Sequence, residues 1–199
     1  MTDALDPRDL MSIPSEVIDA SEKELNNFVL NIPKGVERDK RSVARWTETV
    51  VVEAAQRTNT VGNEGEQNTI FTVKLKVLPV GESENVGKIF TSWMRVNFGA
   101  FAGRSDTSGK KDPKKQRIMS TMSLKKMKQF ASAAGVDLSG GWTPEIFDAL
   151  FPLDTAFPDA TSVLNGQNFL VVMTDAPNRK FPDRPNQQDV ESVVPAEGV

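Results

Sequence analysis

An aromatic and a cationic side chain stand two positions apart in one stretch of this sequence. Trp93 and Arg95 belong to the run Lys88–Phe98, whose alternating apolar residues predict an extended strand. Because side chains two apart in a strand project to the same side, Trp93 and Arg95 would share one face. An exposed indole beside a guanidinium could stack on a nucleobase and contact its phosphate. The alternative is that Trp93 packs beneath the loop that follows, and the sequence leaves both interpretations open.

A basic segment follows this strand. Residues 103–128 hold nine Lys or Arg and two Asp, a net charge of +7, although the whole chain has a formal net charge of −3. Local charge decides which partners a protein attracts, so a polyanion is the expected partner. A lysine-rich segment can also serve solubility alone, and it is the neighbouring aromatic strand that favours binding. The cations offered here are Arg104, Lys110, Lys111, Lys114, Lys115, Arg117 and Lys125.

Residue types that carry most enzyme chemistry are missing from the chain. It has no His and no Cys, which removes the commonest general base, the commonest metal ligand and thiolate chemistry. No glycine-rich phosphate loop or dinucleotide fingerprint is present. Carboxylates could in principle hold Mg²⁺ for a nuclease, but they are scattered over predicted loops and tails. We therefore expect a protein that is not an enzyme, without catalytic residues, a metal site or a cofactor.

The elements that would position these side chains can be predicted from periodicity and turn residues. A helix is expected from Ser15 to about Pro33, with a break near Ser21, and a second from Ser123 to Gly135. The strand at 68–80 alternates, so that Lys74 and Lys76 share its mixed face. If strand register permits, these two lysines join Trp93 and Arg95 in one cationic platform. Further strands are expected at 46–57, 88–98 and 165–174, and a short helix after Thr143 and Pro144.

This order of elements predicts a mainly β fold with inserted helices, an α+β arrangement. We expect a lead and a helix over residues 1–45. A nucleic-acid-binding domain would span residues 46–178 and contain a mobile basic loop at 103–117. Residues 179–199 are rich in Pro, Asn, Asp and Gln and predict a disordered acidic and polar tail.

Four short stretches resemble a known group of proteins. They are Phe71-Thr-Val-Lys-Leu-Lys-Val77, Arg95-Val-Asn-Phe98, the helix end Gln129–Asp137 and the strand entry Leu164–Val172. Over about residues 46–178 the chain resembles the OB-fold, and more narrowly phage-encoded single-stranded DNA-binding proteins and a related phage family of unknown function found near replication and recombination genes. The resemblance implies a five-stranded antiparallel barrel with a helix between strands 3 and 4. It also implies a DNA groove lined by Lys74, Lys76, Trp93, Arg95 and the basic loop.

One feature departs from this resemblance. Bacterial single-stranded DNA-binding proteins end in an acidic tip closed by an aromatic residue that recruits partners, whereas this chain has no aromatic residue after Phe181. Because this aromatic residue is missing, we do not expect the tail to recruit partners in the same way. The acidity of the tail could still compete with DNA for the basic groove.

Two hypotheses for function follow. The first is a non-catalytic single-stranded DNA-binding protein of phage replication or recombination, which would also meet phage or host proteins of those pathways. The second is a structural or interaction protein, such as a virion component or an inhibitor of a host factor. No apolar run reaches the roughly 18 residues that a bilayer span needs, and the N-terminus lacks a signal-peptide pattern. We therefore expect no membrane contact and a cytoplasmic location, in the host cell if the protein is phage-encoded.

Overall fold

Antiparallel strands hold more residues than helices do in this structure, a computed structural model that describes residues 8–30, 44–61, 67–102, 112–154, 161–176 and 187–196. The predicted mainly β fold with inserted helices is confirmed. The described elements are η1 (Asp9–Met11), β1 (Ile13–Pro14), α1 (Ser15–Leu30), β2 (Ala44–Val61), β3 (Gln67–Val77), β4 (Ile89–Val96), η2 (Phe98–Ala100), α2 (Pro113–Ala133), β5 (Gly141–Trp142), α3 (Pro144–Leu150), β6 (Asn168–Ala176) and β7 (Gln187–Pro195).

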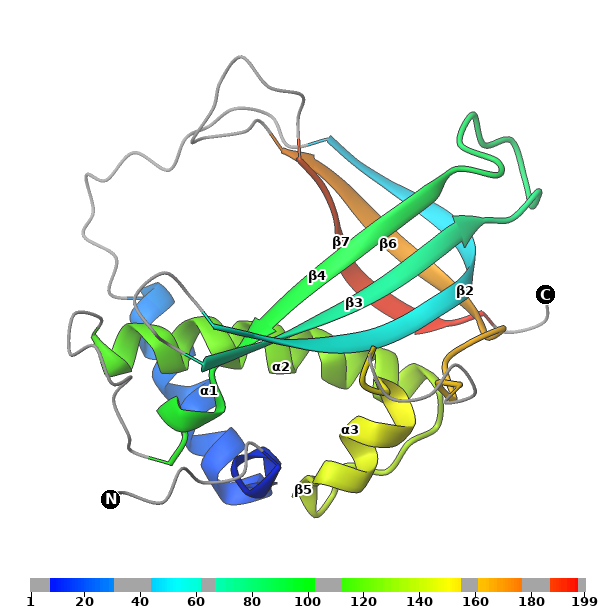
Figure 1. Cartoon of the computed structure of the whole chain (residues 1–199). Helices are drawn as coiled ribbons and strands as arrows, with labels where there is room; N and C mark the ends of the chain where they lie inside the picture. Colours follow the sequence, from blue (N-terminus) through cyan, green and yellow to red (C-terminus); the bar gives the residue numbers. More distant parts are fainter. Residues whose placement is uncertain are drawn as a thin grey trace.

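The main sheet has the strand order β4-β3-β2-β6-β7, and every neighbouring pair is antiparallel. Its centre is the long strand β2, which pairs through its first half with β6 and through its second half with β3. The register of β2 against β3 shifts between Val52 and Ala54, which marks a β-bulge. A bulge bends its strand and increases the local twist. The sheet is accordingly curled, so that its two edge strands approach each other (Figure 1).

The gap between these edge strands, β4 and β7, is called here the seam. Ser92 Oγ on β4 lies 3.4 Å from Asp189 Oδ1 on β7. Elsewhere along the seam, side chains of α2 take the place of a strand partner. Ser120 and Ser123 accept hydrogen bonds from the N–H groups of Asn97 and Arg95, and Gln129 accepts one from Val193. Over the residues described, the strands thus form a curled sheet with a helix-bridged seam, and no closed barrel.

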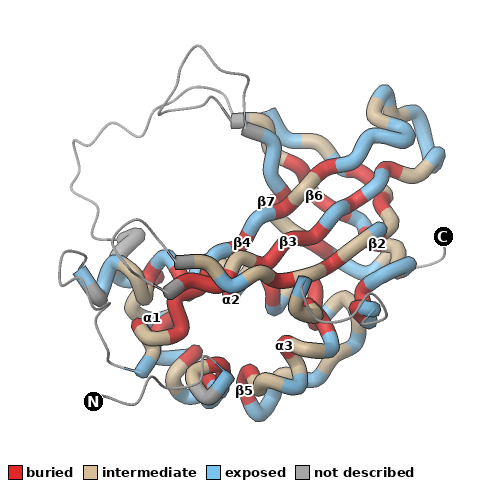
Figure 2. Tube along the Cα trace, in the orientation of Figure 1, coloured by how far each residue is buried: buried red, intermediate tan, exposed pale blue. Residues whose placement is uncertain are grey.

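The hydrophobic core lies between the inner face of the sheet and the helices α2 and α3 (Figure 2). Phe71 is fully buried there, and its ring lies 5.2 Å from that of Phe151 and 5.5 Å from that of Phe147. Alternation along β4 explains its share of the core, because its even-numbered residues are buried and none of its odd-numbered ones is. The N-terminal segment joins the same core through Ile13, which pairs with Trp142 across β1 and β5.

Helix α2 begins ten residues before the predicted start at Ser123. Asp112 is its N-cap and accepts a hydrogen bond from the N–H of Lys114 at 2.9 Å, and Pro113 occupies the first helical position. Asp followed by Pro is a strong helix-start signal, and here it outweighs the unfavourable placing of lysines near a helix N-terminus. The predicted basic loop at 103–117 is therefore wrong from Pro113 onward. Its residues 103–111 lie outside the described part of the chain.

Other predictions of helices had mixed outcomes. Helix α1 begins at Ser15 as predicted but continues without a break through Ser21, whose hydroxyl donates to the Val17 carbonyl at 2.8 Å. Helix α3 follows the predicted signal, because Thr143 Oγ1 accepts a hydrogen bond from the N–H of Ile146. At the end of α2, Gly135 has the positive φ predicted for it.

The predicted disordered tail over residues 179–199 is wrong for residues 187–195. They form β7, which pairs with β6 from Ala176↔Gln187 to Phe169↔Pro195. Its inner face carries Val190 and Val193, both buried. Polar residues and prolines dominate the composition of the tail and indicate disorder. The few valines of β7 form too short a run to predict a strand against that composition. None of the helices in the described ranges is both long and apolar enough to cross a membrane.

Candidate nucleic-acid interface

The outward side of β3 and β4 carries the four residues of the predicted platform. Trp93 lies opposite Thr72, Lys74 opposite Thr91, and Lys76 opposite Ile89 in the antiparallel register. Because Phe71, Val73 and Leu75 are buried on the inner side, alternation places Lys74 and Lys76 on the outer side. Arg95 lies opposite Ile70 on the same side. The register therefore brings Lys74, Lys76, Trp93 and Arg95 together on one face, which is called here the β3–β4 face.

Trp93 is the most exposed large hydrophobic residue in the described part of the chain, at 64%. The alternative that it packs beneath the following loop stays open, because residues 103–111 of that loop lie outside the described part of the chain. Ile89 stands on the same face four residues earlier and is 53% exposed. At about 3.3 Å per residue, the two apolar side chains are spaced by about 13 Å along the strand. Ile89 was not among the residues predicted from the sequence to contact a ligand.

The cations of the β3–β4 face differ in what surrounds them. Lys76 Nζ lies 3.5 Å from Glu53 Oε1, whose residue sits at the bulge of β2. None of the ion pairs found between described residues involves Lys74, and its side chain is exposed. Arg95 is also exposed, and its backbone N–H is held by Ser123 of α2. The face therefore presents an indole among three cationic side chains.

Helix α2 contains six Lys or Arg and no acidic residue, but ion pairs engage four of them. Arg117 donates to Glu24 of α1 through Nε at 2.7 Å and through Nη2 at 3.0 Å. Lys114 lies 3.9 Å from the same carboxylate. Lys126 lies 2.6 Å from Asp189 of β7, and Lys128 lies 3.9 Å from Glu22 of α1. Much of the predicted basic segment thus holds neighbouring elements together.

The Arg117–Glu24 pair changes the proton affinity of both groups. The hydrogen bond from Arg117 is the main cause that lowers the pKa of Glu24, with further lowering from the charges of Arg117 and Lys114. The same hydrogen bond raises the pKa of Arg117. Arg117 was predicted to lie in a mobile loop, and this is wrong, because the residue lies in α2 and joins that helix to α1. Its predicted contact with DNA stays a prediction.

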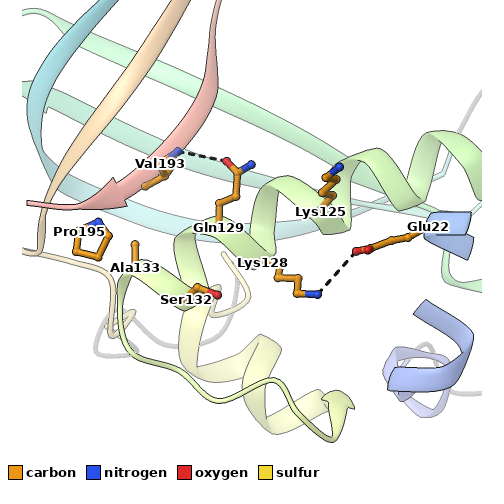
Figure 3. A pocket seen from close by; sticks show the side chains of 8 residues that line it. All are labelled: Glu22, Lys125, Lys128, Gln129, Ser132, Ala133, Val193 and Pro195. Carbon is orange, nitrogen blue, oxygen red and sulfur yellow. Dashed lines mark hydrogen bonds and ion pairs between the residues drawn. The ribbon is translucent and has the colours of Figure 1, made fainter. Parts of the chain in front are cut away.

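Lys115 and Lys125 are the exposed cations of α2 that these ion pairs do not include. Lys125 lines a shallow groove of about 380 Å³ between α1, α2 and β7 (Figure 3). Two residues along a helix lie about 200° apart around its axis, so Lys125 points away from the side on which Ser123 meets β4. The structure therefore does not bring Lys125 to the β3–β4 face. Of the remaining predicted residues, Arg104, Lys110 and Lys111 lie outside the described ranges.

Two exposed residues of α2 were missed by sequence reasoning. Met119 and Met122 are 57% and 53% exposed. They lie between the predicted loop at 103–117 and the predicted helix start at Ser123, so no element was predicted to contain them. Counting helical periodicity from Pro113 would have placed both on one stripe with Lys115.

The described residues include no group of three or more acidic side chains that could hold a metal ion. What the β3–β4 face offers is non-covalent: a flat apolar ring, a second apolar side chain and cations around them. Comparison of the chain with protein-family models, with curated proteins and with solved structures found no match.

Proposed function

We propose that this protein binds single-stranded DNA, without catalysis, through the β3–β4 face. The observation that carries the proposal is the indole of Trp93, which is 64% exposed on the same face as Arg95 of its own strand and Lys74 and Lys76 of the neighbouring strand. Burying such a ring in its own core would be the ordinary outcome for a large aromatic residue. An exposed ring on a cationic face instead suits a ligand that has flat apolar groups and a repeating negative charge.

Single strands match this chemistry better than a duplex does. A nucleobase in a single strand exposes its face for stacking, whereas in a duplex that face is covered by the neighbouring base pairs. Lysine and arginine side chains contact phosphates without reading sequence, and release counterions as they do so. Sequence-specific reading of a duplex usually inserts a helix or ribbon into the major groove. We therefore propose binding with little sequence preference.

We further propose that the sheet is an OB-type barrel that remains open at the seam. The strand order and the position of α2 between the third and fourth strands of the main sheet support this proposal. In OB-folds the face of the second and third strands is a common site for oligonucleotides, and β3 and β4 hold that place here. The resemblance to phage-encoded proteins leads us to propose a role in phage replication or recombination, in the host cytoplasm.

The proposal is tested by fluorescence anisotropy of a labelled oligo-dT, titrated at low and at moderate salt and with duplex competitor. We expect binding that weakens as salt rises and that duplex DNA does not displace. Trp93→Ala should weaken binding by about 1 to 3 kcal/mol, the usual cost of losing one stacked base. Val163→Ala removes part of another exposed apolar side chain and serves as the control, with binding unchanged.

Unchanged affinity in a folded Trp93→Ala protein would overturn the role of the β3–β4 face. Absence of binding by the unaltered protein at low salt would overturn the DNA proposal as a whole. The rival proposal, a structural or interaction protein, would then be pursued by searching for a protein partner whose binding is insensitive to salt.

A further inference from the structure

Two exposed methionines occupy successive turns of α2. Met119 and Met122 are more than half exposed, whereas Met11, Met94, Met127 and Met173 are at most 4% exposed. Lys115 precedes Met119 by four residues and Lys126 follows Met122 by four, so all four side chains fall on one face of the helix. This set, Lys115, Met119, Met122 and Lys126, is called here the α2 stripe. Packing between described elements does not account for its two apolar members.

Hydrogen bonds place the α2 stripe beside the end of the β3–β4 face. Each methionine is followed directly by a serine that binds β4 or the residue after it: Ser123 accepts from the N–H of Arg95 in β4 at 3.1 Å, and Ser120 from that of Asn97, which follows β4, at 2.9 Å. At the other end of the stripe, Lys126 lies 2.6 Å from Asp189, which in turn lies 3.4 Å from Ser92, the neighbour of Trp93. The stripe therefore follows the seam next to the strand that carries Trp93 and Arg95.

The charge of α2 favours a polyanion as the occupant of the α2 stripe through Lys115, since Lys126 is already paired with Asp189. Helix α2 has no acidic residue, and Lys115 takes part in none of the ion pairs found between described residues. Methionine is flexible and polarisable, so it adapts to flat surfaces of different shape. A nucleobase is such a surface, and a phosphate accompanies each one.

We propose that the α2 stripe is a second contact area for the same single strand that stacks on Trp93. Bases pack against Met119 and Met122, and Lys115 contacts a phosphate between or beside them. This inference rests on the proposed function and deepens it, because it gives the strand a path from the β3–β4 face across the seam to α2. The binding site is then longer than the β3–β4 face alone.

The experiment compares oligo-dT of about 5 and about 15 nucleotides, lengths within the range that single OB-folds occupy. A longer oligonucleotide offers more positions at which the same short site can bind. For the unaltered protein we expect its affinity to rise by more than this increase in positions explains. The double variant Met119→Ser with Met122→Ser should bind the short one unchanged and lose about tenfold or more for the long one. Val163→Ser, which changes another exposed apolar residue, should leave both unchanged.

A second measurement needs no variant. In a protein with ¹³C-labelled methionine methyl groups, the long oligonucleotide should shift the signals of Met119 and Met122 and leave those of buried Met11 and Met173 in place. The inference would be overturned if the double variant bound each oligonucleotide as tightly as the unaltered protein does and the methyl signals did not shift. The proposed function would then remain intact. If the unaltered protein binds neither oligonucleotide, the proposed function and the inference fall together.

Discussion

At the scale of single residues, the cations of this chain differ by whether a carboxylate already faces them. Lys128 lies 3.9 Å from Glu22 and Arg117 donates twice to Glu24, whereas Lys74 takes part in none of the ion pairs found between described residues. A paired cation must give up or share its partner before a phosphate gains from it. A count of lysines along the sequence therefore overstates the charge that a ligand meets.

Lys74→Ala and Lys128→Ala test this distinction within one experiment. If Lys74 contacts one phosphate, its loss should reduce the slope of log affinity against log salt by about 0.7, the value for single strands. Lys128 already faces α1, so its replacement should leave the slope unchanged. The measurement is oligo-dT binding at four or more salt concentrations. Equal slopes for Lys74→Ala and the unaltered protein would remove Lys74 from the interface.

The β3–β4 face could be predicted at this scale from alternation alone. Trp93, Arg95, Lys74 and Lys76 were placed on one side of their strands, and the register confirms that they share a face. The exposure of Trp93 could not be predicted, because an amphipathic ring in a strand is equally suited to pack or to project. The pairing of Arg117 with Glu24 was also beyond reach, since it joins residues 93 positions apart.

At the scale of elements, a glycine determines how the N-terminal lead docks on the core. Gly141 has φ +94°, and a Cβ at this position would collide with the backbone of Ile13, Pro14 and Ser15. We expect Gly141→Ala to destabilise the fold by about 3 kcal/mol or more, because left-handed strain adds to the collision. Gly140→Ala is the matched control, since its Cβ would meet nothing within 4 Å. Urea unfolding of the two variants measures the difference, and similar midpoints would contradict the expectation.

The contact between α1 and α2 should depend on pH through Glu24. Its pKa is lowered in the folded protein, so the pair with Arg117 stabilises the fold above the unfolded pKa of about 4.3. That contribution is lost as pH falls through the folded pKa. For a pair of this kind we expect on the order of 1 kcal/mol. Urea midpoints between pH 3 and 6 should show a smaller fall for Glu24→Gln than for the unaltered protein, and parallel curves would contradict this.

Elements with strong local signals could be predicted, and those defined by distant partners could not. Thr143 with Pro144 predicted the start of α3, and the alternation of apolar residues predicted β3 and β4. Strand β7 gains its order from β6 and from Gln129 of α2, contacts that no local pattern contains. Tertiary pairing overrides composition in such a segment.

At the scale of the whole molecule, Asp189 joins three elements across the seam. It lies 2.6 Å from Lys126 of α2 and 3.4 Å from Ser92 of β4. We expect Asp189→Asn to destabilise the fold by about 1 kcal/mol and to speed amide hydrogen exchange in β7 before the rest of the sheet. Glu191→Gln is the comparison, because Glu191 also lies on β7 and the change removes only its exposed ion pair with Arg45 of β2. Equal exchange in β7 for both variants would show that Asp189 does not hold the seam.

The central place of β2 has a consequence for how the chain reaches this structure during synthesis. Val50 pairs with Val77 on the next strand but also with Phe169, which leaves the ribosome much later. Contacts between residues far apart in sequence form slowly, because a long loop must close first. Until then, the nascent meander β2-β3-β4 leaves the edge of β2 that pairs with β6 without a partner. An unpaired strand edge is prone to pairing with other chains. Its vulnerable interval ends only when β6 has been translated.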